Sequence, residues 1–188
     1  IIGTKAGFAW TSSSKHRAKT QIDASFDKIV SSVEQSLKRL NIDAIPIVFI
    51  HYPDPNTPLE ETVSALNSLR ERGLIKAAGL SNFSAAAVQE ALNYGKIDAV
   101  QILYSLTERQ NKEILNVCSS NNLNLMAYGV LNRGLLTGKY TKESNFPATD
   151  RRSRLSDFQG NELNKRLALL ETLHCIAKRY KRTPAEVA

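Results

Sequence analysis

Short apolar runs and helical periodicities alternate along the chain. Apolar residues recur at steps of three and four from residue 20 to residue 40, which predicts a long helix. Continuous apolar runs of strand length occupy residues 45–50, 74–80, 97–101 and 123–128, and residues 1–4 are typical of the end of another strand. Helical patterns lie between these runs. The alternation predicts an α/β protein with five parallel strands and helices outside them.

Residues between these elements carry signals for caps and loops. Thr57 followed by Pro58 predicts an N-cap and the first residue of a helix, and Thr183 with Glu186 has the capping-box spacing of a second helix start. Glycine and serine favour a loop over residues 6–14. A longer loop is expected from residue 129 to about residue 160, followed by an amphipathic helix from Asn161.

Two architectures accommodate five parallel strands: an open doubly wound sheet, and a (β/α)8 TIM barrel of which only part is present. The sequence opens inside a strand and closes at a helix N-terminus, which favours the barrel. We therefore expect residues 1–188 to form a single barrel domain, truncated at both ends.

Composition is ordinary for a globular protein, with 42% apolar and 23% charged residues, and no apolar run approaches the roughly 20 residues of a membrane span. The net charge of +7 favours an anionic partner, which could be nucleic acid, a phosphorylated metabolite or a dinucleotide. Cys118 and Cys175 lie in different helical segments without metal-ligand spacing. We interpret them as packing thiols, and they favour a reducing cytoplasm.

Polar residues stand at the exit of each predicted strand, either as its last residue or directly after it. Because the carboxyl ends of parallel strands meet at one edge, these residues are candidates for one site. A lysine lowers the pKa of a nearby phenol, a histidine can donate a hydrogen bond to a carbonyl, and amides can orient a carboxamide. An aromatic ring offers a flat surface to a planar cofactor. The candidates are Lys5, His51, Ser81, Asn82, Gln101 and Tyr128.

The long loop adds glycines and cations that suit phosphate groups: Gly129, Arg133, Gly134, Gly138 and Lys139. It is not a P-loop, because three residues instead of four separate Gly134 from Gly138, and Tyr140 stands where a hydroxyl of Ser or Thr is needed. No GxGxxG follows any strand, so a Rossmann fold is unsupported.

Four strings together resemble the aldo-keto reductase family, in order and at family spacing. They are Ile50-His51-Tyr52-Pro53-Asp54-Pro55, Pro58-Leu59-Glu60-Glu61-Thr62, Gly79-Leu80-Ser81-Asn82-Phe83-Ser84 and the run from Tyr128 to Lys139. The last string, with Phe146-Pro147 and Asp150-Arg151-Arg152, is most similar to the bacterial general-stress and inositol-cluster branch and to potassium-channel beta subunits.

This resemblance implies a TIM barrel that reduces aldehydes or ketones with NADPH, the five strands being its third to seventh. It implies that Lys5 tunes an acid tyrosine and that His51 orients the substrate carbonyl. Trp10 would line the substrate pocket. The cofactor would be bound by Ser81, Asn82, Gln101, Tyr128, Gly129, Val130, Leu131, Asn132, Arg133, Gly134 and Lys139. The partner is then a small carbonyl compound in the cytoplasm, with no metal, nucleic acid or membrane.

The family pattern is also incomplete in this sequence. The catalytic aspartate and tyrosine of the family would lie before Ile1, and the basic residues for the adenosine 2′-phosphate after Ala188, so we expect negligible turnover from these residues alone. Pro46 replaces a usually acidic residue and removes a ladder donor. Two alternatives remain: a catalytically weak NADPH-binding regulatory subunit on the same fold, and a partial barrel whose exposed sheet edges form a homo-oligomer.

Overall fold

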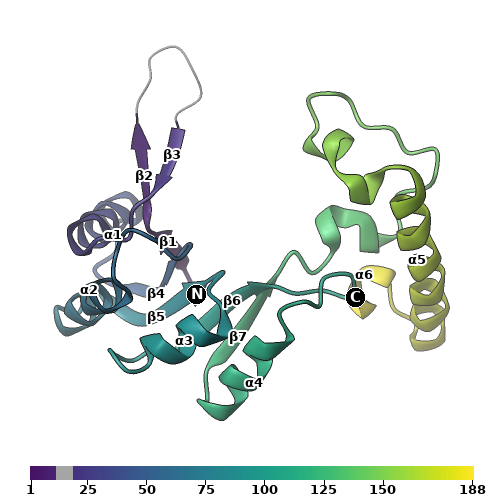
Figure 1. Ribbon diagram of the computed structural model, residues 1–188. Helices are drawn as coiled ribbons and strands as arrows, with labels where there is room; N and C mark the ends of the chain where they lie inside the picture. The colour runs from purple at the N-terminus through teal and green to yellow at the C-terminus, as the bar shows by residue number, and fades with distance from the viewer. Residues whose placement is uncertain (12–18) are drawn as a thin grey trace. The chain divides into compact units, whose positions relative to one another are not determined.

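The computed structural model describes residues 1–11 and 19–188 (Figure 1). By contacts, the chain divides into two compact units. The first unit comprises residues 1–102 and 111–126, and the second comprises residues 103–110 and 127–188. The expectation of a single domain stays a prediction.

A five-stranded sheet runs through most of the chain, as the apolar runs predict. Its strand order is β1-β4-β5-β6-β7, and the three pairings from β1 to β6 are parallel. The strands are β1 (Gly3–Ala6), β4 (Ile45–Ile50), β5 (Ile75–Ser81), β6 (Ala99–Leu103) and β7 (Asn124–Tyr128). Pro46 lies in β4 ahead of the pairing with β1, which begins at Ile47, so that pairing does not need its missing donor.

Four helices of the first unit lie along the outside of the sheet (Figure 1): α1 (Phe26–Leu40), which precedes β4, and α2 (Leu59–Glu71), α3 (Ala85–Ala91) and α4 (Lys112–Ser120), which follow β4, β5 and β6. Their apolar stripes are buried, with Ile29 and Val33 on α1 and Leu66 and Leu69 on α2 at 0–1% exposure. Burying each such side chain stabilises the fold by roughly 1.5–3 kcal/mol. Because the paired strands are parallel and the helices return outside the sheet, the carboxyl ends of the strands lie together at one edge.

A hairpin replaces part of what the sequence predicts as loop and helix. Residues 8–11 form β2 (Phe8–Thr11) and residues 19–22 form β3 (Lys19–Ile22), which pair antiparallel with Phe8 opposite Ile22. The predicted helix therefore begins at Phe26 and not at Thr20, because Ile22 is used in cross-strand pairing. The predicted loop residues Ser12, Ser13 and Ser14 lie outside the described residues.

Two strands extend further along the chain than the sequence predicts. Lys5 lies within β1, where it pairs with Phe49, and Gln101 lies within β6, where it pairs with Ser81. The prediction that Lys5 follows its strand is wrong, and Gln101 is not the last residue of its strand as predicted, because each strand continues past the apolar run that marks it in the sequence, β1 to Ala6 and β6 to Leu103.

Residues of two of the strings that resemble the reductase family form hydrogen bonds that connect loops of the first unit. Asp54 accepts from the Ala24 N–H at 2.9 Å and from the Thr57 hydroxyl at 2.8 Å. The prediction that Thr57 is the N-cap of α2 is wrong: the N-cap is Pro58, whose carbonyl accepts from the N–H groups of Glu61 and Thr62. Glu61 accepts from the Phe26 N–H at 2.9 Å, at the start of α1. These contacts tie the segment after β4 to the entry of α1.

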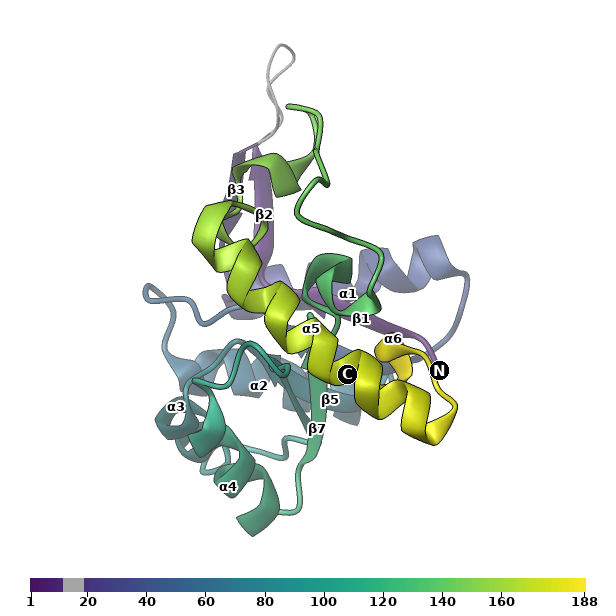
Figure 2. The same cartoon turned by 90° about the vertical axis from the view of Figure 1, so that its right-hand side faces the viewer.

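The second unit contains the long loop and the C-terminal helices. Within the predicted loop are three short 3₁₀ helices, η1 (Asn132–Thr137), η2 (Arg151–Arg154) and η3 (Ser156–Phe158), before α5 (Gly160–Tyr180) begins one residue earlier than expected. Leu136, Leu170 and Leu173 form a buried cluster, against which the end of α6 (Pro184–Val187) packs beside α5 (Figure 2). Thr183 and Glu186 form the predicted capping box.

The two cysteines differ in their surroundings. Cys118 is buried in α4, and burial raises the pKa of its thiol. Cys175 is exposed on α5, so its interpretation as a packing thiol is wrong: it lies outside the apolar stripe of that helix. In the described residues, no helix combines the length and apolar character needed to cross a bilayer.

We expect Asp54→Asn to destabilise the protein by roughly 1–3 kcal/mol at neutral pH, since it weakens several hydrogen bonds to one carboxylate. Burial alone would raise the pKa of Asp54, but bonds from Ala24, Asn56 and Thr57 outweigh it and lower the pKa. The stabilisation is therefore present at neutral pH and is lost as the pH falls through the lowered pKa. Urea unfolding at several pH values measures this. The prediction would be contradicted if the difference in free energy of unfolding between the two proteins did not shrink in acid. An equal loss of stability in Asp43→Asn, a substitution at an exposed residue, would also contradict it.

Candidate active site

The parallel register places four candidate residues on one face of the sheet. Lys5 pairs with Phe49, and His51 follows two residues later, so both side chains project from the same face. In the same way Phe49 pairs with Gly79, and Ser81 pairs with Gln101. The His51 N–H donates to the Ala6 carbonyl at 2.9 Å, which continues the alignment one residue past β4.

Gly79 makes this face possible. An added Cβ at residue 79 would come within 2.4 Å of the Phe49 ring and within 2.9 Å of the Ala99 carbonyl oxygen. Only glycine therefore lets the Phe49 ring cross the middle strand beneath the polar residues.

Lys5 and His51 form the electrostatic centre of the site. Burial lowers the pKa of His51, and the positive charge of Lys5 lowers it further. The imidazole is consequently neutral at physiological pH, with one N–H that can donate to a ligand oxygen. Since a neutral ring also accepts through its other nitrogen, His51 can orient a polar group without adding a second cation beside Lys5.

Aromatic rings surround His51. The Phe8 ring meets the imidazole edge-on at 4.8 Å between centroids, and Tyr52 stacks on it at 5.0 Å. Trp10 lies next to Phe8, with centroids 6.5 Å apart, and is 67% exposed. Sequence reasoning identified Trp10 but missed Phe8 and Tyr52. The alternation of Phe8 and Trp10 on one side of a strand was a usable signal.

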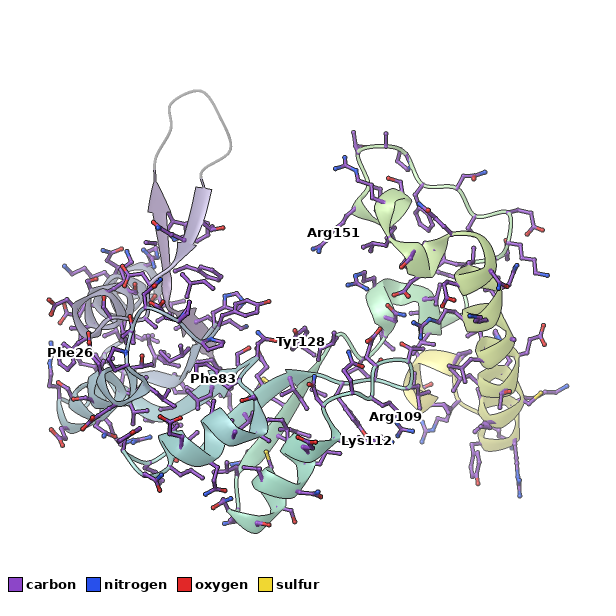
Figure 3. The ribbon with its side chains drawn as sticks, in the orientation of Figure 1. Phe26, Phe83, Arg109, Lys112, Tyr128 and Arg151 are labelled. Atoms are coloured by element: carbon purple, nitrogen blue, oxygen red, sulfur yellow. The ribbon has the colours of Figure 1, made fainter. Side chains whose placement is uncertain are left out.

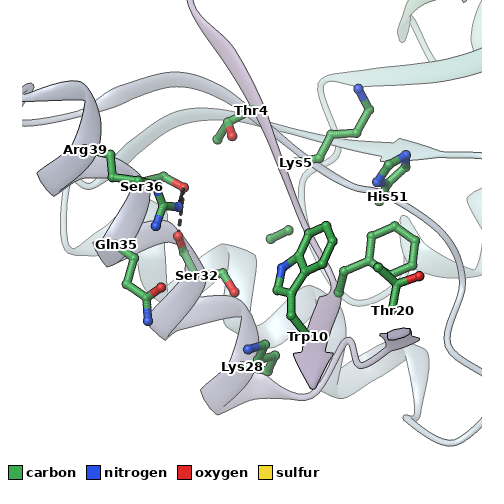
Figure 4. A pocket seen from close by; sticks show the side chains of 12 residues that line it. Thr4, Lys5, Trp10, Thr20, Lys28, Ser32, Gln35, Ser36, Arg39 and His51 are labelled. Carbon is green, nitrogen blue, oxygen red and sulfur yellow. Dashed lines mark hydrogen bonds between the residues drawn. The ribbon is translucent and has the colours of Figure 1, made fainter. Parts of the chain in front are cut away.

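A cavity of about 660 Å³ in the first unit contains Lys5, His51 and Trp10 in its wall (Figure 4). The wall also includes Phe8 and, from α1, cationic and polar side chains. None of the described residues that line the cavity carries a carboxylate. Its remaining lining residues are Thr4, Ala6, Thr20, Lys28, Ser32, Gln35, Ser36 and Arg39. The predicted catalytic pair and the predicted substrate residue therefore share one cavity.

Hydrogen bonds link the amide residues across three strands. The Asn82 side-chain N–H₂ donates to the His51 carbonyl at 2.9 Å and to the Ser81 hydroxyl at 3.0 Å. The Ser81 hydroxyl in turn lies 3.4 Å from Oε1 of Gln101. Ser81 and Gln101 are both buried, and Asn82 adopts a left-handed φ of 64°. The side chains are thus held in fixed orientations, as recognition of a planar amide requires.

The remaining predicted cofactor residues belong to the second unit. Tyr128 ends β7 (Figure 3), and the backbone then turns through positive φ angles at Gly129, Asn132, Arg133 and Gly134. The Lys139 ammonium lies over the Tyr140 ring, 4.9 Å from its centroid. Val130 and Leu131 lie in the turn between β7 and η1. These residues form one continuous segment, as the sequence predicts.

The model of the aldo/keto reductase family matches residues 1–188, so the chain belongs to this family. It is 35% identical to Aldo-keto reductase YhdN of Bacillus subtilis over 190 residues, and the matched region covers 100% of this chain and 56% of that protein. It is 33% identical to the NADH-specific methylglyoxal reductase of Escherichia coli, over 97% of this chain and 58% of the relative. The chain therefore spans about half the length of these relatives.

A solved structure supports the same family. The glycerol dehydrogenase AKR11B4 from Gluconobacter oxydans superposes with a TM-score of 0.93 at 33% identity, over 97% of this chain and 56% of that one. The prediction of a partial TIM barrel is thereby confirmed, as is the resemblance to the reductase family. The comparisons give no support to the likeness to potassium-channel subunits.

Lys5→Met should raise the pKa of His51, because it removes the positive charge that opposes protonation of the ring. The pKa should remain below its ordinary value, since burial is the larger cause. Proton NMR titration of the imidazole resonances measures the shift. Lys28→Met, on the α1 side of the same cavity, is the matched control. An unchanged or lower pKa in Lys5→Met would show that the two groups do not interact.

Proposed function

We propose that this chain forms the carbonyl- and nicotinamide-binding part of an NADPH-dependent oxidoreductase that reduces aldehydes or ketones to alcohols. The observation that carries the proposal is the common face on which Lys5 and a neutral His51 lie beside the buried pair Ser81 and Gln101. Family membership supports carbonyl reduction with a nicotinamide cofactor in general.

The amide residues suit a carboxamide. The Gln101 amide carries both a hydrogen-bond donor and an acceptor, and the Ser81 hydroxyl can donate or accept. These groups complement a carboxamide, which also carries a donor and an acceptor. Asn82 reaches across to the His51 carbonyl and so relates this subsite to the catalytic pair. When bound here, NADPH would supply the hydride.

Lys5 and His51 suit the carbonyl end of the reaction. The neutral imidazole donates a hydrogen bond to the substrate oxygen and fixes its direction. The Lys5 ammonium stabilises negative charge that develops on this oxygen, and it would favour ionisation of an adjacent phenol. The family resemblance assigns the proton to a tyrosine that is not among these residues, so we propose that residues 1–188 alone have negligible turnover.

Aromatic side chains suit the substrate's carbon skeleton. We propose that Trp10 lines the pocket together with Phe8 and Tyr52, since Phe8 and Tyr52 contact the His51 ring, Trp10 lies next to Phe8, and all three rings present apolar surface. In the second unit we propose that Tyr128 stacks on the nicotinamide, and that residues 129–134 with Lys139 accompany the cofactor phosphates. Positive φ angles in this turn bring backbone N–H groups within reach of an anion.

We propose NADPH over NADH because the resemblance to the family implies NADPH, and the net charge of +7 is compatible with the more highly charged dinucleotide. Relatives differ in this respect: the name of one from Schizosaccharomyces pombe, 33% identical, specifies NADP(+), and the Escherichia coli reductase is NADH-specific. We also propose a cytoplasmic protein in which all these residues belong to one barrel domain. Two free cysteines support the reducing compartment.

In the complete protein, His51→Ala should lower kcat for aldehyde reduction by about 10²–10⁴-fold, the usual contribution of a positioned acid–base group, with NADPH affinity retained. Steady-state kinetics and titration calorimetry measure the two quantities. His174→Ala is the matched control, because His174 is exposed on α5 and bonds only to its own helix at the Leu170 carbonyl in the described structure. Unaltered kcat in His51→Ala would exclude the assigned role.

NADPH should bind about tenfold more tightly than NADH, or better, since one further charge-assisted contact is worth roughly that factor. Calorimetric titration of the complete protein with each dinucleotide measures the ratio. Equal affinities would rule out the cofactor preference. Tight binding of NADPH with almost no turnover of any carbonyl would favour the regulatory subunit instead.

A further inference from the structure

A closed set of polar contacts surrounds the turn after β7. Asn132 donates from its side-chain amide to the Thr107 hydroxyl at 3.2 Å, and the Thr107 carbonyl accepts from Arg166 at 3.2 Å. Arg166 donates to Asp157 at 3.0 Å, Asp157 pairs with Arg133 at 3.5 Å, and Arg133 donates to Oδ1 of Asn132 at 3.2 Å. We call these five residues the Asp157 ring. It connects three separate segments of the second unit.

The ring encloses backbone that would not hold its shape unaided. Asn132 and Arg133 have φ angles of 43° and 55°, in the left-handed region, and Gly134 follows at 91°. Two consecutive non-glycine residues in this region are strained and persist only when their surroundings fix them. Asn132 is buried, and its side chain bonds on both sides within the ring. The ring therefore supplies the contacts that keep the turn left-handed.

Arg133 is engaged within the ring, which bears on what it can do. Its guanidinium already meets an amide oxygen and a carboxylate, so its positive charge is balanced by Asp157. The inner part of the ring is the less exposed one: the side chains of Asp157 and Arg166 are 16% and 20% exposed, against 44% for Arg133. Glu108 lies 3.9 Å from Arg166 and adds a second carboxylate there.

We infer that Asp157 and Arg166 are positioning residues for the turn at residues 132–134, acting through Arg133, and that Arg133 serves this turn by its internal contacts and not as a free cation for phosphate. The inference rests on the proposed function, in which this turn accompanies the cofactor phosphates. The two roles of Arg133 predict opposite effects of removing the Asp157 charge. If Arg133 acts as a free cation, NADPH should bind more tightly, because a competing carboxylate is gone. If Arg133 holds the turn, NADPH should bind more weakly, because the turn loses its anchor.

The test is calorimetric titration of the complete protein with NADPH. Asp157→Asn should weaken binding by about tenfold, the factor for losing one charge-assisted hydrogen bond. Arg133→Gln should weaken it by a similar factor, and the double variant should be little worse than either single one, because both break the same ring. The KM for NADPH should rise with kcat retained at saturation. Unchanged or tighter binding in Asp157→Asn would overturn the inference.

Two controls make the result specific. Glu162→Gln removes the same charge from an exposed pair with Lys165 on α5 and should leave NADPH binding unchanged. Arg166→Lys keeps the charge but lacks the planar fork that reaches both Thr107 and Asp157, so it should weaken binding to an intermediate degree. An Arg166→Lys variant that binds as the unaltered protein does would count against the ring, as would a Glu162→Gln variant as weak as Asp157→Asn.

Hydrogen exchange without cofactor separates this inference from the proposed function. In Asp157→Asn, backbone amides of residues 129–138 should exchange faster, since the turn opens more often. If the unaltered protein does not bind NADPH, the proposed function fails, yet the exchange comparison still decides whether the ring holds the turn. Equal exchange in both proteins would refute the inference whatever the outcome of the titration.

Discussion

Parallel hydrogen bonding between β1, β4, β5 and β6 determines which side chains of the first unit can act together. In this register Lys5, His51, Ser81 and Gln101 share one face, although they come from four segments of the chain. A slip of one residue between two of these strands would turn one partner to the opposite face. Gly79 and the Phe49 ring that crosses it fill the layer beneath, so the backbone pairing and the packing of this face support each other.

Contacts between loops then fix residues that the sheet does not hold. Asp54 and Glu61 bond to backbone N–H groups before and at the start of α1, so two of the strings that characterise the family hold this segment in place. The same segment leads from the hairpin whose Phe8 ring contacts His51. The second unit uses side chains in a similar way at Asn132 and Arg133, where the backbone is strained. In both places hydrogen bonds made by side chains set loop geometry, joined in the second unit by the ion pair of Arg133 with Asp157, and apolar burial sets the framework.

The sequence predicted the parts of the structure that local pattern controls. Five strands and their helices follow from runs and periodicities, and His51, Ser81 and Asn82 follow from their place after apolar runs. The residues that could not be found depend on long-range contacts. Residues 20–22 have an apolar residue at helical spacing from α1, but pairing with β2 makes them a strand. Asp157 and Arg166 look like ordinary surface charges, since nothing local indicates that they meet Arg133.

The Phe8, His51 and Tyr52 rings also have a magnetic consequence. The imidazole lies edge-on to one aromatic ring at 4.8 Å and stacked with another at 5.0 Å. Circulating π-electrons shift the resonances of nearby protons according to whether they lie above a ring or at its rim. The carbon-bound protons of His51 should therefore resonate away from those of a solvent-exposed histidine. A ligand that displaces Phe8 or Tyr52 would move these signals, which gives the site an intrinsic reporter that needs no label.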